Sequence, residues 1–240
     1  MTLKIVSLFP DVLGTYGDHG NARILAHLLH LAGRSYELIA VGINDPVPAD
    51  GDLYLLGGGE DGPQALAARR LAEGSPLHRV VERDRPILAI CAGYQLLGRS
   101  FVAEGTTLPG LGLLPVESVR GSARMVGEVL LTPFVPIGQS LMTGFENHGG
   151  QTILDSDAQP LGRVYRGVGN GGDGYDGIVH GSIIGSYLHG PILARNPGLA
   201  QWLLARIGVE AHELSHHHWA LHEERVHASE GALWSRQHGA

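Results

Sequence analysis

Residues 86–98 constrain the fold more than any other part of the chain. The apolar run Ile87–Ile90 leads directly into Cys91, the single cysteine, and a helix-like segment follows at once. Ala89 and Gly93 lie two residues before and after this cysteine, as a sharp turn from a strand into a helix requires. Such a turn would place the thiol at a helix N-terminus, where the thiolate is favoured. The alternative is a buried core cysteine, and these residues alone do not decide between the two.

The composition excludes several classes of protein. A chain of 240 residues that is 43% hydrophobic and 17% charged can bury a full core, as one large domain or as a domain with an appendage. A net charge of −7 argues against a general nucleic-acid binder. One cysteine excludes an internal disulfide framework and a cysteine-rich zinc site, and it fits a reducing compartment. The first ten residues are typical of a strand rather than a signal peptide, and no apolar run is long enough to span a bilayer.

The first half of the chain alternates apolar runs with helical periodicity. The helical segments are 22–32, with Asn21 as N-cap, and about 64–82, divided near Gly74 and Pro76. The predicted strands are Leu3–Leu8, Tyr36–Val41, Leu53–Leu56 and Ile87–Ile90. This order predicts an α/β fold with a doubly wound, mostly parallel sheet of the flavodoxin-like kind.

The pattern changes between residues 101 and 157. Strands are predicted at 116–119, 127–131 and 143–151 without helices between them, which indicates a mixed or antiparallel extension of the sheet. Glycine-rich residues 162–177 predict a surface hairpin or loop. Strands at 178–180 and 183–188 and a helix at 197–207 complete a predicted domain of residues 1–207.

Residues 208–240 form a histidine-rich tail that we expect to be helical. His212 with His216, and His218 with His222, are four residues apart, and two imidazoles with this spacing can share a metal ion. We favour a solvated histidine-rich helix instead, because no third ligand is identifiable. A tail that docks on a partner is a third possibility.

Three sequence features follow predicted strands and therefore meet at one edge of the sheet. They are the glycines 57–59, Cys91 and His189. The carboxyl-terminal edge of a parallel sheet is where sites form. A cysteine nucleophile, a histidine base or ion-pair partner, and backbone N–H groups that bind an oxyanion are the parts that acyl transfer needs.

These motifs resemble class I (triad-type) glutamine amidotransferases, in the branch similar to cobyric acid synthase. The residues that carry the resemblance are Cys-Ala-Gly-Tyr-Gln at 91–95, Gly-Gly-Gly-Glu at 57–60 and Tyr-Leu-His-Gly-Pro at 187–191. Residues 16–21, 144–150 and 185–193 are most similar to the two-subunit members of the branch, in which the glutaminase serves a separate ligase. The resemblance covers about residues 3–205 and leaves out the tail.

The resemblance implies a glutaminase reaction. Cys91 would attack the side-chain amide of L-glutamine, giving a thioester and ammonia, and water would then release glutamate. The ammonia would pass to a Mur-ligase-like subunit (MurT), which with ATP and Mg²⁺ amidates the α-carboxyl of D-glutamate in the stem peptide of lipid II to form D-isoglutamine. This chain itself would hold no cofactor or metal. It would be a cytoplasmic member of a heterodimer, acting at the inner face of the membrane through its partner.

The resemblance also assigns roles to individual residues. Gly58 and Ala92 would form the oxyanion hole, and Gln95 would help to hold glutamine. Arg124 would bind the substrate, although an ordinary surface arginine near a strand start is the alternative. Pro191 stands where many triad enzymes have a glutamate, which implies a Cys–His dyad and leaves open what orients His189.

Two other functions stay open. One is the glutaminase component of a cobyrinate-type amidotransferase, in which the glutaminase is usually fused to a synthetase domain. This chain shows no P-loop and starts at the first strand, so we favour the two-subunit arrangement. The other is an inactive binding module, against which the intact Cys91 and His189 argue.

Overall fold

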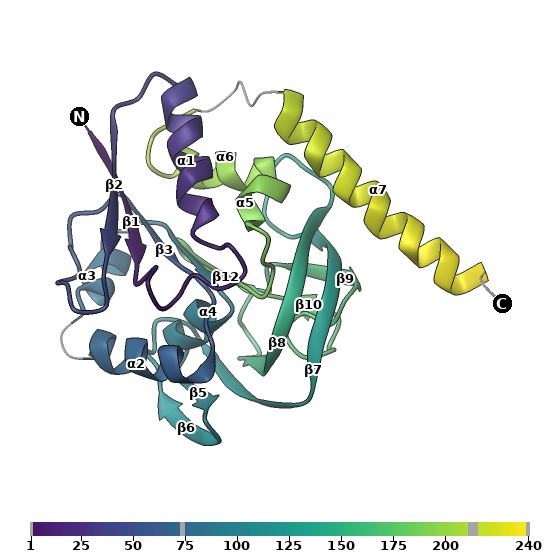
Figure 1. Cartoon of the computed structure of the whole chain (residues 1–240), viewed down its shortest axis with the longest axis horizontal. Helices are drawn as coiled ribbons and strands as arrows, with labels where there is room; N and C mark the ends of the chain where they lie inside the picture. Colours follow the sequence, from purple (N-terminus) through teal and green to yellow (C-terminus); the bar gives the residue numbers. More distant parts are fainter. Residues whose placement is uncertain (1, 73–74, 211–215, 239–240) are drawn as a thin grey trace.

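The chain folds around a six-stranded, mostly parallel sheet (Figure 1). The computed structural model describes residues 2–72, 75–210 and 216–238. The strand order is β11-β12-β4-β3-β1-β2, and all neighbours are parallel except the edge strand β11. The strands are β1 (Leu3–Leu8), β2 (Tyr36–Val41), β3 (Leu53–Leu56), β4 (Ile87–Ile90), β11 (Ile178–His180) and β12 (Ile183–Ser186). The predicted doubly wound sheet is therefore confirmed.

Helices pack on both sides of this sheet through apolar stripes. They are α1 (Gly20–Leu31), α2 (Asp61–Ala72), α3 (Leu77–Glu82), α4 (Ala92–Leu97), α5 (Ile192–Arg195) and α6 (Pro197–Ala205). In α1, Leu25, Leu28 and Leu29 recur at helical spacing and are fully buried. The prediction of Asn21 as N-cap is wrong, because His19 occupies the cap. The Asn21 amide oxygen instead accepts a hydrogen bond from the backbone N–H of Leu193 (3.0 Å), which ties α1 to α5.

The expected extension of the sheet is a separate second sheet. Its order is β10-β9-β7-β5-β6, with β8 also paired to β7. The strands are β5 (Ser100–Ala103), β6 (Thr106–Pro109), β7 (Val116–Pro133), β8 (Met142–Leu154), β9 (Gly162–Arg166) and β10 (Tyr175–Asp176). The two strands predicted at 116–119 and 127–131 are parts of the single strand β7, which continues through an irregularity between Arg120 and Met125.

Two short backbone bridges connect the loops that leave the first sheet. Thr15, after β1, pairs with Gly58, after β3, and His189, after β12, pairs with Phe145 of β8. The carboxyl-terminal edge of the parallel sheet therefore faces the β7–β8 hairpin of the second sheet, and a site at that edge has walls from both sheets.

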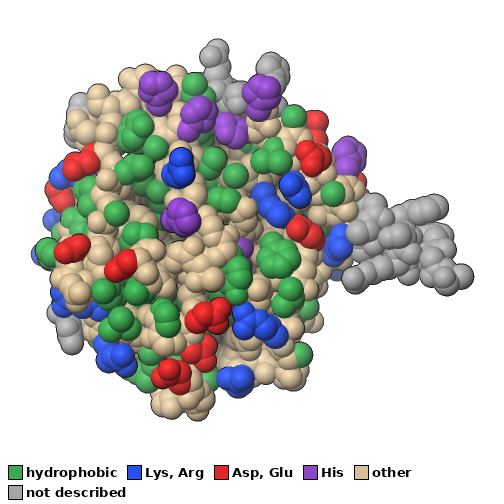
Figure 2. All heavy atoms as spheres, viewed as in Figure 1, with side chains coloured by type: hydrophobic (Ala, Val, Ile, Leu, Met, Phe, Trp, Pro, Cys, Tyr) green, Lys and Arg blue, Asp and Glu red, His purple; other side chains and the backbone are tan. Residues whose placement is uncertain are grey.

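The helix α7 (His216–His238) confirms the expected helical tail and crosses the second sheet before it extends past the body (Figure 1). The buried His222 contacts the carbonyl of Arg195 (2.9 Å), so this helix is not merely solvated. Histidines gather on one face (Figure 2). The rings of His27 and His218 lie 5.6 Å apart. His212 lies outside the described residues, and among those described no three side chains form a metal-binding group. Within the same ranges, no helix is long and apolar enough to cross a membrane.

We expect Gly185→Ala to destabilise the first sheet. An added Cβ on this β12 glycine would lie 2.2 Å from the ring of Tyr94, which is fully buried and cannot move aside. Such overpacking costs about 1–3 kcal/mol of the free energy of unfolding, which urea denaturation measures. The control is Gly127→Ala, where an added Cβ meets no atom within 4 Å. Equal midpoints for the two variants would contradict the prediction.

Candidate active site

Cys91 lies on the sharp turn that the sequence predicted. It joins β4 to α4 with φ 51° and ψ −107°, a backbone conformation that is strained for a residue with a side chain. Gly93 makes the turn possible, since a Cβ there would lie 2.6 Å from the Cβ of Leu56. The backbone N–H of Cys91 donates to the carbonyl of Ser186 on the neighbouring strand (2.9 Å), which fixes the turn against the sheet.

His189 is brought to Cys91 from the loop after β12. Its backbone exchanges two hydrogen bonds with Phe145 (2.9 and 3.1 Å), and its side chain is completely buried. Gly58 lies between the two side chains: an added Cβ there would be 2.6 Å from Cε1 of His189 and 3.3 Å from Cβ of Cys91. The structure thus brings the predicted nucleophile and base together, and it explains why a glycine separates them.

A carboxylate orients His189, and it comes from a part of the chain that the sequence did not single out for this role. Asp18, in the loop after β1, accepts a hydrogen bond from Nδ1 of His189 onto Oδ2 (2.8 Å), and both side chains are buried. The expected dyad without a carboxylate is therefore wrong. Because Asp18 accepts, Nδ1 carries a proton and Nε2 is the nitrogen left for Cys91; it has no hydrogen-bond partner among the described residues.

The pKa of His189 favours the imidazolium form. Burial alone lowers the pKa, but the hydrogen bond to Asp18 and the interaction with Cys91 outweigh it and raise the pKa to about 10. At neutral pH this histidine therefore carries a positive charge. A cationic imidazole beside a cysteine stabilises the thiolate, which is the reactive form of the nucleophile.

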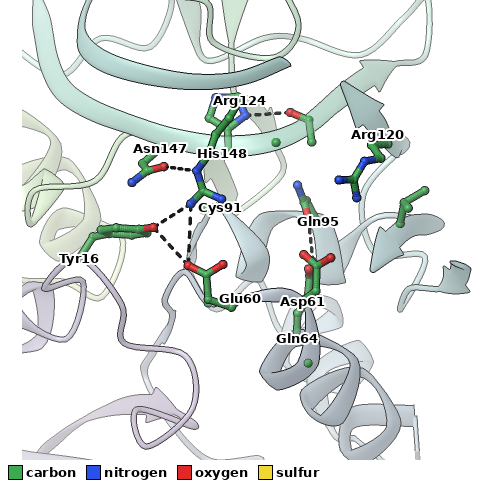
Figure 3. A pocket seen from close by; sticks show the side chains of 15 residues that line it. Tyr16, Glu60, Asp61, Gln64, Cys91, Gln95, Arg120, Arg124, Asn147 and His148 are labelled. Carbon is green, nitrogen blue, oxygen red and sulfur yellow. Dashed lines mark hydrogen bonds and ion pairs between the residues drawn. The ribbon is translucent and has the colours of Figure 1, made fainter. Parts of the chain in front are cut away.

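A cavity of about 360 Å³ opens over Cys91 between the two sheets (Figure 3). Its size is that of sites for small molecules. Two basic and two acidic side chains line it, together with polar groups. The residues with side chains in the wall are Tyr16, Glu60, Asp61, Gln64, Cys91, Gln95, Val102, Arg120, Arg124, Asn147 and His148.

The family model for the CobB/CobQ-like glutamine amidotransferase domain matches residues 4–197. The chain belongs to this family. The matched region holds both sheets and every residue of the candidate site, and the whole of α7 lies beyond it.

The chain is similar to curated proteins from two groups within this family. The chain is 34% identical to the "Lipid II isoglutaminyl synthase (glutamine-hydrolyzing) subunit GatD" of Streptococcus pneumoniae, over 84% of this chain and 79% of that protein. With GatD of Staphylococcus aureus it shares 35% identity over 85% and 84% of the two chains. Cobyric acid synthase of Sphingopyxis alaskensis is 34% identical over 75% of this chain, but over only 36% of its own length. The solved structure of PurLQS from Thermotoga maritima has the same fold (TM-score 0.55, 18% identity, 94% and 100% coverage).

For this member of the amidotransferase family, the structure does not support Gly58 as a ready oxyanion donor. The Gly58 N–H donates to Oδ2 of Asp18 (2.8 Å), the oxygen that also binds His189. Ala92, the other expected donor, is the first residue of α4 and directly follows the nucleophile.

Gln95 lies in the cavity wall, but its amide is already occupied. Its oxygen accepts from Nε2 of Gln64 (2.7 Å), and its nitrogen donates to the hydroxyl of Tyr187 (2.9 Å). The ring of His148 stacks on Tyr187 at 3.8 Å. The structure therefore gives Gln95 the role of a fixed wall, and the expected direct contact with substrate would require these bonds to change.

Arg124 reaches into the cavity from β7, as the family resemblance implied. Its Nε donates to Oδ1 of Asn147 (2.6 Å), and its Nη2 donates to the hydroxyl of Tyr16 (3.0 Å) (Figure 3). The Tyr16 ring stands edge-on to His189, with ring centres 4.9 Å apart. Two hydrogen bonds therefore hold the Arg124 guanidinium in the cavity wall. Substrate binding by Arg124 stays a prediction.

Three site residues were missed by sequence reasoning: Tyr16, Asp18 and Gln64. A signal existed for Asp18 and Tyr16, because their loop follows β1 and so ends at the same sheet edge as the other motifs. Gln64 had no such signal, since it lies within α2; its Nε2 donates to Oε1 of Gln95 (2.7 Å) and to the carbonyl of Ala92 (3.4 Å).

Proposed function

We propose that this chain is the glutaminase subunit of a lipid II isoglutaminyl synthase. The observation that carries the proposal is the buried Asp18–His189 pair beside Cys91, the single cysteine, whose backbone is strained and which lines the cavity. The match to GatD over most of both chains supports this acceptor.

The residues present suffice for the hydrolysis of an amide. The Cys91 thiolate attacks the side-chain carbonyl carbon of L-glutamine, and the carbonyl electrons move to oxygen. As the tetrahedral intermediate collapses, Nε2 of His189 gives its proton to the nitrogen, and ammonia leaves from a glutamyl thioester. The neutral imidazole then takes a proton from water, the hydroxide attacks the thioester, and glutamate leaves as the thiolate re-forms.

Charge develops on the amide oxygen during both attacks. The backbone N–H of Ala92 is the donor next to the nucleophile. A second donor at Gly58 requires its N–H to turn away from Oδ2 of Asp18, to which it donates. Arg124, which lines the cavity, would bind the substrate α-carboxylate.

The ammonia would serve a Mur-ligase-like partner in a heterodimer, where ATP and Mg²⁺ activate the α-carboxyl of D-glutamate in lipid II. The glutaminase subunit would hold no cofactor or metal, and it would work in the cytoplasm at the inner membrane face through that partner. Neither step calls on nucleic acid.

The test is co-purification with the candidate ligase, followed by an assay for glutamine-dependent amidation of lipid II. Glutamate release coupled to amide formation is the expected result. Amidation with free ammonia but not with glutamine would overturn the glutaminase assignment. A purified complex that amidates a cobyrinate instead of lipid II would support the second candidate, which the match to cobyric acid synthase favours.

Labelling with a glutamine-analogue electrophile distinguishes the two glutaminase candidates from an inactive binding module. It should label Cys91 in the complex, because the analogue delivers its reactive carbon to the thiolate. Failure to label in the presence of the partner would favour a binding role.

A further inference from the structure

A carboxylate and a guanidinium face each other at the mouth of the cavity. Oε1 of Glu60, in the loop after β3, lies 3.8 Å from Nη2 of Arg124 on β7 (Figure 3). The hydroxyl of Tyr16 connects them, since it donates to Oε1 (3.2 Å) and accepts from Nη2 (3.0 Å). The two charged side chains are 60% and 51% exposed. An ion pair this long and this exposed is weak, so either partner can turn to a ligand at small cost.

The arrangement is complementary to the head group of a free amino acid. An α-amino acid carries an ammonium and a carboxylate on one carbon, so a site for it needs opposite charges side by side. Arg124 supplies the cation and Glu60 the anion. Asp61 also lines the cavity, but its Oδ2 already accepts the backbone N–H of Glu104 (2.9 Å).

Tyr16 and the shared cavity connect the charge pair to the reacting groups. Tyr16 spans the interval, with its ring against His189 and its hydroxyl at the pair. One tyrosine side chain therefore separates the imidazole from the charges. Glutamine likewise carries its amide at one end and its α-ammonium and α-carboxylate at the other, joined by two methylenes. Cys91 lines the same cavity, so one molecule can occupy both ends.

We propose that Glu60 binds the α-ammonium group of the substrate next to Arg124, and so selects free glutamine over amides that lack this group. The inference rests on the proposed function and adds a specificity-determining residue to it. Tyr16 then holds the two charged side chains next to each other through its hydroxyl.

The test compares two substrates on the complex with its ligase partner. They are L-glutamine and glutaramic acid, which is glutamine without its amino group. For Glu60→Gln we expect the KM for glutamine to rise about tenfold, as the loss of one hydrogen bond to a charged group predicts, with kcat little changed. The KM for glutaramic acid should stay the same. The matched control is Glu117→Gln, another exposed glutamate paired with an arginine, which lies outside the cavity.

The two substrates separate recognition from positioning. An equal rise in KM for both would mean that Glu60 only holds Arg124 in place, and this would overturn the inference. An unchanged or lower KM for glutamine in the variant would overturn it as well. A wild-type complex that hydrolyses no glutamine would overturn the proposed function itself, whereas an active wild type with either of the former results overturns only the role of Glu60.

Discussion

Replacing Cys91 with alanine should abolish glutamine hydrolysis. The thiolate is the only nucleophile that this mechanism uses, and water has no comparable path to the amide carbon. Loss of the nucleophile from a hydrolase of this kind lowers kcat by at least about 10⁴-fold. Glutamate release from the complex is the measurement, with amidation of the acceptor by free ammonia as the readout of the ligase. We expect the first to fall to background and the second to persist.

The serine variant provides the control for folding and binding. Cys91→Ser keeps the shape of the side chain, so the strained turn and the cavity should survive, and glutamine should still bind. A weakly ionised hydroxyl cannot replace the thiolate, and hydrolysis should be lost as completely as with alanine. Substantial glutamate release by either variant would show that another group performs the attack.

Strands buried on both faces are the part of the fold that the sequence predicts best. The bounds of β3 (Leu53–Leu56) and β4 (Ile87–Ile90) are those of uninterrupted apolar runs, because a covered parallel strand has no solvent side. The edge strand β2 (Tyr36–Val41) is also predicted, although most of its residues are exposed, and its aromatic and β-branched residues are typical of strands.

The second sheet was harder to predict, since its strands depend on pairing more than on their own pattern. Between Arg120 and Met125 the hydrophobic alternation disappears, yet β7 continues because β8 pairs with it on both sides of the irregularity. The β5–β6 hairpin is absent from the predicted strands for a similar reason. Its turn at Glu104 and Gly105, both with positive φ, joins strands of only four residues each.

In the candidate site, too, local features are predictable from the sequence, whereas contacts between distant segments are not. Cys91 and Gly93 are predictable as site residues from their local sequence, and His189 is predictable from its position after a strand. The partner of His189 lies 171 residues away in sequence, and no local pattern records which loop supplies it. The direction of the Gly58 N–H is likewise set by Asp18 and not by the glycine motif, so the motif alone overstates its readiness as an oxyanion donor.

Replacing Asp18 with asparagine should lower kcat by up to about 10⁴-fold, the loss that follows when the carboxylate behind a catalytic histidine is neutralised. The amide oxygen can keep the hydrogen bonds from His189 and Gly58, so the change is mainly one of charge. Without the carboxylate, the buried imidazolium loses its main stabilisation and its pKa falls. The thiolate then loses its cationic neighbour, and the leaving ammonia loses its proton donor.

The pH profile distinguishes this effect from simple misfolding. The activity should decline at high pH, where the imidazolium deprotonates, and in the asparagine variant this alkaline limb should move to lower pH.

The free energy of unfolding should depend on pH in the same direction as the activity. A histidine whose pKa is raised from about 6.5 unfolded to about 10 folded contributes stability that is complete below the unfolded value and is lost as the pH rises through the folded one. The variant should therefore be destabilised most near pH 6, and urea midpoints of the two proteins should converge toward pH 10. Asp45→Asn, which changes an exposed loop carboxylate that accepts the N–H of Gly42, is the control. An alkaline limb that stays in place in the Asp18 variant would show that this carboxylate does not set the charge of His189.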